Sequence, residues 1–250
     1  MQTKTEMISK NQIKYIRQLE LKKFRKREKC FVAEGPKVVG DLMRRFHPKA
    51  VFATSEWNQG DKILVTDEEL HRISFLQTPQ QVLALFPIPD SPSSVSHNPS
   101  SLALALDGVQ DPGNLGTIIR IADWFGIDTI YCSENTADAY NPKVVQATMG
   151  SLAHVHIKYT DLMQLFDTLP KDYPIYGTLL DGSDIYQQSL SKHGIIVMGN
   201  EGNGISEAVR QHVNHRLLIP NFNQGDCAES LNVAIATAIT CSEFRRRDIK

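Results

Sequence analysis

Short apolar runs alternate with helical segments over the second half of the chain. The helical stretches are predicted near 114–125, 141–149, 161–169 and 205–213, with a last helix over 231–246. Near-continuous apolar strands joined by crossover helices are typical of a mainly parallel sheet with helices on both faces. The pattern predicts an α/β domain over residues 102–250, with any ligand site at the carboxyl ends of the strands. The runs of strand length are Leu102–Leu106, Thr129–Cys132, Val155–Lys158, Ile175–Leu180, Ile195–Met198 and Arg216–Ile219.

The first 86 residues mix helical and strand patterns. Apolar residues at Ile13, Ile16 and Leu19 have helical spacing, and apolar runs at 50–53, 62–65 and 82–86 indicate short strands. We therefore expect a small α/β domain over residues 1–86. A Pro/Ser-rich stretch at 87–101 reads as a linker, because it holds few large apolar groups that could form a core.

Composition narrows the class of protein. The chain has 250 residues, of which 41% are apolar and 22% charged, as expected for one or two globular domains. No apolar run is long enough to span a membrane, and the first residues lack the apolar core of a signal peptide. The four cysteines (Cys30, Cys132, Cys227 and Cys241) are scattered and form no CxxC pair. This favours reduced thiols in the cytoplasm over a zinc ribbon or a disulfide framework.

Charge is distributed unevenly. Residues 1–50 carry 14 Lys and Arg against 5 Asp and Glu, a balance of +9, whereas the other 200 residues carry 13 against 23, a balance of −10. A basic segment on an otherwise acidic protein indicates a polyanionic partner, although a solvated lysine-rich helix face explains it equally well. The densest basic run includes Lys22, Lys23, Arg25, Lys26 and Arg27.

The first candidate segment follows the strand Leu102–Leu106. A helix over 114–125 places Leu115, Ile118, Ile119 and Ala122 on one apolar face, with Arg120 on the opposite side beside Trp124. A helix that is apolar on both sides is expected to be buried on both, once by its own sheet and once by something else, such as a second subunit. For Arg120 two interpretations stay open: a functional cation, or a surface arginine paired with Asp123.

Two further candidate segments follow strands that come later in the chain. The strand Ile195–Met198 runs into Gly199, Gly202 and Gly204, a GxxGxG spacing that matches neither the dinucleotide fingerprint nor a phosphate loop. After the strand Arg216–Ile219, Ser230 is a candidate N-cap of a helix that we expect to be buried, and Asn232 in its first turn would then need a partner. His154 and His156 have no carboxylate at ligand spacing, so no metal site is expected.

Together these segments resemble motifs 1, 2 and 3 of the SpoU (TrmH-like) RNA ribose 2′-O-methyltransferases of the SPOUT superfamily. Motif 1 matches Asn114-x5-Arg120, motif 2 matches 199–202, and motif 3 matches Ile219-Pro220 with 230–233; the stretch 140–151 also reads as family sequence. The resemblance covers about residues 102–246. The first domain resembles, more loosely, the family's substrate-binding module, which is related to a ribosomal-protein fold that binds kinked RNA, through Phe31-Val32-Ala33-Glu34-Gly35.

The resemblance implies a deep C-terminal trefoil knot that holds S-adenosylmethionine, an obligate homodimer and an RNA substrate, rRNA or tRNA. The loop Asn221–Glu229 is a few residues longer than is usual in the family. Residues at the family's catalytic and RNA-contacting positions are Asn114, Arg120, Glu201, Ser230 and Asn232. Residues expected to hold the cofactor are Thr178, Leu179, Gly199, Ile219 and Leu231.

Two other functions compete with RNA methylation. One is a non-catalytic RNA-binding paralogue that acts in ribosome assembly, against which intact Arg120, Glu201 and Asn232 speak. The other is a nicotinamide oxidoreductase, which the glycine spacing disfavours. The sequence leaves the RNA and the modified nucleotide undetermined.

Overall fold

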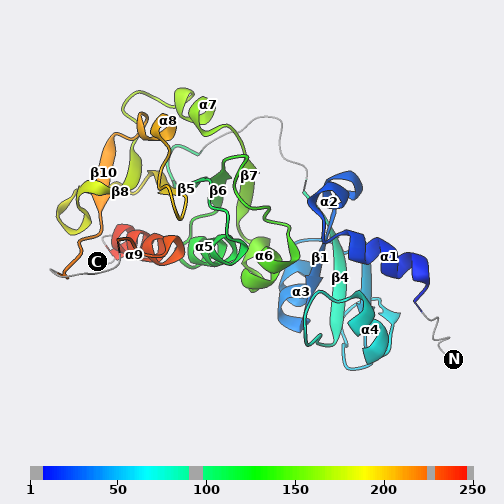
Figure 1. The fold of residues 1–250 in the computed structure, drawn as a ribbon. Coiled ribbons are helices and arrows are strands. Elements are labelled where there is room, and N and C mark those ends of the chain that lie inside the picture. Colours follow the sequence, from blue (N-terminus) through cyan, green and yellow to red (C-terminus); the bar gives the residue numbers. More distant parts are fainter. Residues whose placement is uncertain (1–7, 90–97, 224–228, 247–250) are drawn as a thin grey trace. The chain divides into compact units, whose positions relative to one another are not determined.

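The computed structural model describes residues 8–89, 98–223 and 229–246. The chain divides into two compact units, drawn in Figure 1. The N-terminal unit comprises Met1–Asp90 and Asp138–Ala153, and the C-terminal unit comprises Ser91–Ala137 and His154–Lys250. Residues 138–153 were expected in the second domain, whereas in the structure they pack with the first. Residues 90–97 of the predicted linker lie outside the described residues.

The N-terminal unit is built on a four-stranded sheet in the order β1-β4-β2-β3, with β1–β4 and β2–β4 antiparallel and β2–β3 parallel. Helices α1 and α4 pack against the sheet in one hydrophobic cluster, which includes Ile16, Leu19, Val32, Leu70 and Leu83. Its strands are β1 Cys30–Glu34, β2 Ala50–Ala53, β3 Ile63–Leu64 and β4 Val82–Pro87. Its helices are α1 Lys10–Gln18, α2 Lys22–Glu28, α3 Pro36–Met43, α4 Asp67–Ile73, α6 Pro142–Ala147 and the 3-10 helix η1 Ser151–Ala153.

The C-terminal unit contains a six-stranded sheet in the order β10-β8-β9-β5-β6-β7, in which every pair of neighbours is parallel. Helices α7 and α8 lie on one face, and α5 and α9 on the other (Figure 1). This confirms the predicted parallel sheet with helices on both faces. Its strands are β5 Leu102–Asp107, β6 Thr129–Cys132, β7 His156–Tyr159, β8 Ile175–Asp184, β9 Gly194–Gly199 and β10 His215–Leu218. Its helices are α5 Pro112–Trp124, α7 Leu162–Asp167, the 3-10 helix η2 Ile185–Gln187, α8 Glu207–Arg210 and α9 Val233–Arg246.

One irregularity in this sheet bears on the site. Strand β10 pairs with β8 at Arg216↔Gly177 and next at Leu217↔Ser183, so residues 178–182 leave the ladder. At the end of this excursion the β10 backbone comes very close: a Cβ added at Gly182 would lie 2.5 Å from the carbonyl carbon of Leu217. The excursion therefore needs glycine, and it opens space at the carboxyl edge of the sheet.

The helix α9 differs from the buried helix that the sequence predicted. Its residues Val233, Ala234 and Thr237 are buried, but Ile235 is 52% exposed. Trp124 at the end of α5, for which burial was expected, is 85% exposed in the single chain. The two helices pack against each other, and each presents a large apolar side chain to solvent.

Candidate active site

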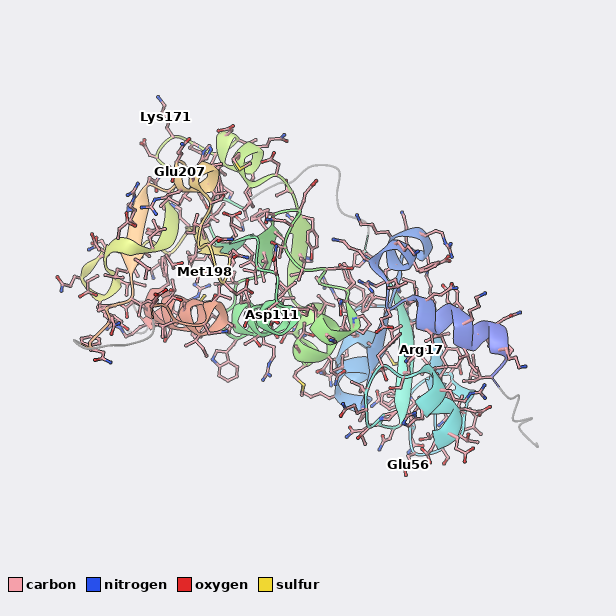
Figure 2. The ribbon with its side chains drawn as sticks, viewed as in Figure 1. Arg17, Glu56, Asp111, Lys171, Met198 and Glu207 are labelled. Carbon is pink, nitrogen blue, oxygen red and sulfur yellow. The ribbon has the colours of Figure 1, made fainter. Side chains whose placement is uncertain are left out.

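A cavity of about 630 Å³ lies at the carboxyl edge of the C-terminal unit's sheet. Three loops line it: residues 178–181 of the β8 excursion, residues 199–205 after β9, and residues 217–219 with 229–231 after β10. In Figure 2 the labelled Met198 in β9 and Asp111 at the start of α5 locate this edge. All five residues expected to hold a cofactor line the cavity: Thr178, Leu179, Gly199, Ile219 and Leu231.

The turn after β9 is packed against its own backbone. A Cβ added at Gly199 would lie 2.2 Å from the carbonyl carbon of Gly204 and 2.3 Å from the nitrogen of Ile205. Since real Cβ atoms do not approach backbone so closely, only glycine fits there. The close approach leaves the backbone of the turn facing the cavity without a side chain in between.

Asn200 fixes the shape of the same turn. Its backbone N–H and C=O each pair with Gly204 at 2.9 Å, and its side-chain oxygen accepts from Gly202 N at 2.9 Å and Asn203 N at 3.0 Å. Its side-chain nitrogen donates to the carbonyl oxygen of Gly108 at 2.7 Å. Asn200 was not among the residues predicted from the sequence, although asparagine in a glycine-rich turn commonly bonds its own backbone.

Asp107, the last residue of β5, holds the far end of the turn. Its side chain is 8% exposed, and its Oδ2 accepts from the backbone nitrogen of Ser206 at 2.7 Å. Asp107 was not predicted as a site residue either. The available signal was a carboxylate at the end of an otherwise apolar strand.

A chain of polar side chains connects the three predicted motifs. The Asn114 side-chain nitrogen donates to Glu201 Oε1 at 3.0 Å, and the Asn232 side-chain nitrogen donates to Asn114 Oδ1 at 2.9 Å. Glu201 also accepts from the backbone nitrogens of Gln110 at 3.2 Å and Asp111 at 3.1 Å. Residues that are 87 and 118 positions apart in the sequence thus form one hydrogen-bonded group.

Hydrogen bonding sets the charge state of Glu201. Burial acts to raise the pKa of this carboxyl, but the side chain of Asn114 and the backbone N–H groups of Asp111 and Gln110 outweigh it and lower the pKa below its usual value. The group therefore stays ionised at neutral pH and keeps accepting these bonds.

The structure corrects the roles that the sequence suggested for Ser230 and Asn232. Asn232, not Ser230, caps α9: its Oδ1 accepts from Ala234 N at 2.9 Å and Ile235 N at 3.3 Å. Asn232 is exposed rather than buried, and its partner is Asn114. Ser230 is exposed and lines the cavity. Residues 224–228 of the long third loop, including Asp226 and Cys227, lie outside the described residues.

Arg120 projects from α5 into solvent. Its side chain makes no hydrogen bond or ion pair with any residue that the structure describes. The alternative pairing with Asp123 is not observed, because Asp123 faces His154 Nδ1 at 3.2 Å. The guanidinium is thus available to a ligand.

The basic run in the N-terminal unit forms helix α2. Lys22, Lys23, Lys26 and Arg27 are exposed on it, as expected for cations that meet a polyanion. For Arg25 the prediction of an RNA-binding cation is wrong. The residue is 2% exposed, with Nη2 2.6 Å from Asp138 Oδ2 and Nη1 donating to the carbonyl oxygens of Leu19 and Glu20 at 2.7 and 2.6 Å. Its guanidinium is committed to the fold and is not free to bind RNA.

The described residues offer neither a metal site nor a membrane span. Within residues 8–89, 98–223 and 229–246, no three His, Cys, Asp or Glu side chains gather where they could hold a metal ion. The helices of those same ranges include none with the length and hydropathy of a membrane span.

Comparison with known proteins identifies the family. The profile of the SpoU rRNA Methylase family matches residues 101–242, and that of the MRM3-like substrate binding domain matches residues 10–84. The 23S rRNA (guanosine(2553)-2'-O)-methyltransferase RlmP of Bacillus subtilis is 31% identical over 95% of this chain and 97% of its own.

Solved structures similar to this chain are also RNA methyltransferases. A putative RNA methyltransferase of the TrmH family from Porphyromonas gingivalis superposes with a TM-score of 0.88 at 41% identity, covering 97% of this chain and 100% of that one. The AdoMet-bound rRNA methyltransferase of Sinorhizobium meliloti gives 0.83 at 31% identity over 95% of both chains. The chain belongs to the SpoU rRNA methylase family.

Proposed function

We propose that this protein transfers a methyl group from S-adenosylmethionine to a ribose 2′-hydroxyl of a structured RNA, rRNA or tRNA. The observation that carries the proposal is the cavity at the sheet edge beside the hydrogen-bonded chain Glu201–Asn114–Asn232. The relatives support it, since one is named as a 23S rRNA 2′-O-methyltransferase and one was crystallised with AdoMet bound.

The cavity suits S-adenosylmethionine in size and chemistry. Its volume lies within the range of about 300–1,000 Å³ that is typical of small-molecule sites. Leu179, Leu217, Ile219 and Leu231 supply apolar walls for a purine, and the turn at Gly199 offers bare backbone for its polar atoms. When bound, S-adenosylmethionine supplies a methyl group on a positively charged sulfur. We further propose that the chain forms a trefoil knot around this site.

The chain's own residues hold and orient the reacting groups. Because a ribose hydroxyl is a weak nucleophile, fixing it at attack distance could account for about 7–11 kcal/mol of the barrier. Glu201, Asn114 and Asn232 are pre-arranged by their mutual hydrogen bonds and can orient the hydroxyl with Ser230 at the cavity rim. We expect these four residues to position the substrate.

Arg120 is the residue that we expect to meet the target phosphate and the charge that develops on the ribose oxygen. A guanidinium binds oxyanions through a fork of N–H donors, and that of Arg120 has no competing partner in the described part of the chain. It is a poor general base, because guanidinium groups stay protonated in proteins. Its role is therefore anchoring and charge stabilisation.

The N-terminal unit is proposed to hold the RNA outside the catalytic site. Its match to a substrate binding domain and the exposed Lys22, Lys23, Lys26 and Arg27 of α2 support this role. Cations that neutralise phosphates release counterions and make binding depend on salt.

A homodimer is the proposed working form. Trp124 on α5 and Ile235 on α9 are exposed apolar side chains on two helices that pack together. Arg245 of α9 holds this helix against the end of α5, because it donates to the carbonyl oxygens of Phe125 at 2.8 Å and Gly126 at 3.1 Å. A fixed, apolar two-helix face is suited to a second copy of the chain.

The non-catalytic alternative has no support, because the relatives named here are methyltransferases and the cavity and motifs are intact. We propose that the reaction occurs in the cytoplasm. Cys30, Cys132 and Cys241 are buried and unpaired, which suits a reducing compartment.

Mapping 2′-O-methyl sites in total RNA from cells with and without the gene tests the proposal. We expect one methylated nucleotide, or a small group of them, to disappear with the gene and to return when it is restored. An unchanged map in cells that normally express the protein would contradict the proposal.

A further inference from the structure

One charged cluster at the cavity remains outside the roles assigned above. Asp181 and Arg210 both line the cavity, and the Asp181 carboxylate accepts from Arg210 Nη2 and, at 3.3 Å, from Arg216 Nη1. Asp181 belongs to the excursion 178–182 that leaves the β8–β10 ladder. The excursion thus carries a carboxylate to the cavity wall.

The hydrogen bonds of Asp181 are asymmetric. Both guanidinium groups meet Oδ2, while Oδ1 bonds to no residue within the described ranges. The Asp181 side chain is half exposed, and ion pairs in such positions contribute little to stability. The two arginines fix the carboxylate's orientation and balance its charge, and Oδ1 is left as a strong acceptor on a residue that lines the cavity.

The chemistry of the proposed donor shows what that acceptor can bind. An adenine ring is accommodated by apolar walls and backbone atoms, which the cavity has at Leu179, Ile219 and Leu231. The ribose is the polar middle of the molecule, and its hydroxyls need acceptors. The nearby Thr178 hydroxyl donates to the carbonyl oxygen of Val197 at 3.2 Å, so it can meet a ribose hydroxyl only as a neutral acceptor, which is weaker than a carboxylate. In dinucleotide-binding α/β folds, which differ from this one, a carboxylate accepts from the ribose 2′-hydroxyl, so the pairing of these two groups has a precedent.

We propose that Asp181 determines specificity for the donor: its open oxygen accepts a hydrogen bond from a ribose hydroxyl of S-adenosylmethionine, and Arg210 and Arg216 position the carboxylate. This inference rests on the proposed function.

Calorimetric titration of the full-length protein tests this assignment. The probes are S-adenosylhomocysteine, which resembles the donor but cannot react, and its 2′-deoxy and 3′-deoxy analogues. Because a hydrogen bond to a charged group is strong, we expect the wild type to bind at least one deoxy analogue about 10- to 100-fold more weakly. Asp181→Ala should weaken S-adenosylhomocysteine by a similar factor and bind that analogue and the parent compound equally well.

Three variants complete the design, each checked for folding by its thermal-unfolding midpoint. Arg210→Gln should weaken binding less than Asp181→Ala and keep part of the discrimination. Asp181→Asn, which preserves shape, serves if the alanine variant fails to fold, and should lower the discrimination below that of the wild type. Asp172→Ala removes an exposed carboxylate of the same unit that does not line the cavity, and should change nothing.

The outcomes separate two claims. If the wild type binds S-adenosylhomocysteine but Asp181→Ala discriminates against the deoxy analogue as the wild type does, the role of Asp181 is wrong and the proposed function stands. Equal binding of all three probes by the wild type overturns the role as well. Failure of the wild type to bind S-adenosylhomocysteine contradicts the proposed function itself.

Discussion

Mutation of two neighbouring cations of helix α2 should affect two different properties of the protein. Arg25 is buried and bonded to Asp138, whereas Lys26 is exposed. The informative pair of changes is Arg25→Met, which keeps much of the side chain's apolar bulk, and Lys26→Gln, which keeps a polar surface residue. We expect the first to affect folding and the second to affect RNA binding.

The expected loss for Arg25→Met follows from its contacts. The change leaves the Asp138 carboxylate and the carbonyl oxygens of Leu19 and Glu20 without these donors in a largely dry site. Removing one partner of a buried ion pair costs about 3–5 kcal/mol. Asp138 is still 14% exposed and keeps a bond from the backbone nitrogen of Tyr140, so we expect a loss near 3 kcal/mol. Lys26→Gln should cost less than about 0.5 kcal/mol.

Urea unfolding and RNA binding at several salt concentrations measure the two effects. Lys26→Gln should reduce the slope of log affinity against log salt by about 0.7–0.9, the share of one phosphate contact. Arg25→Met should lower the urea midpoint and leave that slope unchanged where the protein is folded. The double variant Arg25→Met/Asp138→Leu is the control, and should recover part of the stability because no charge is left buried.

The reasoning fails if Arg25→Met keeps the wild-type urea midpoint and flattens the salt dependence as Lys26→Gln does. Arg25 would then contact RNA directly, and its burial against Asp138 would be irrelevant to the fold.

Three further predictions concern the C-terminal unit. Gly199→Ala should weaken S-adenosylhomocysteine binding at least 100-fold in calorimetry, because its Cβ would lie 2.2 Å from Gly204; wild-type affinity would disprove the close approach. Glu201 has a lowered pKa, so its stabilising bonds should be complete above the unfolded-state pKa of about 4.3 and be lost as the pH falls through its lower folded-state value. Thermal midpoints of wild type and Glu201→Gln should accordingly differ by a constant amount well above the unfolded-state pKa, and the difference should shrink steadily as the pH falls below it; a difference that does not shrink with falling pH would refute this. Trp124→Glu/Ile235→Glu should sediment as a monomer in analytical ultracentrifugation where the wild type sediments as a dimer, and a monomeric wild type would exclude the proposed assembly.

The parallel sheet was predictable because burial on both faces makes each strand an apolar run. Strands such as Leu102–Leu106 and Ile195–Met198 stand out against their polar surroundings and agree with β5 and β9 to within one residue. Element ends were less predictable. The predicted N-cap Ser230 and the actual cap Asn232 are both good capping residues, and only the bonds that Asn232 accepts from the backbone of Ala234 and Ile235 identify it as the cap.

Other features could not be predicted because they depend on contacts between residues that are far apart in the sequence. Arg25 looks like its exposed neighbours in the run Lys22–Arg27, because nothing local reveals that Asp138 lies 113 residues away in sequence and 2.6 Å away in space. For the same reason the packing of residues 138–153 with the N-terminal unit was missed. Exposure of Ile235 was unpredictable from an apolar pattern that reads the same for a core as for a surface that meets another copy.

The site was predicted as a set of residues but not as an arrangement. Family motifs indicated Asn114, Glu201 and Asn232, and the structure adds that the three form one hydrogen-bonded chain. Asn200 and Asp107 shape the turn through hydrogen bonds to the backbone; their residue types gave a signal for a structural role but not for a functional one. Asp181 was hidden for a different reason, because its place at the cavity depends on an irregularity of strand pairing.

Analysis of the reaction product tests the account most directly. Purified protein is incubated with methyl-labelled S-adenosylmethionine and transcripts of 23S rRNA and of tRNA, and the RNA is digested to nucleosides and separated. We predict label in a 2′-O-methylnucleoside with the wild type, and a large loss with Arg120→Lys, which keeps the charge but not the fork. Label in a methylated base, or near-normal transfer by Arg120→Lys, would contradict the mechanism derived from this site.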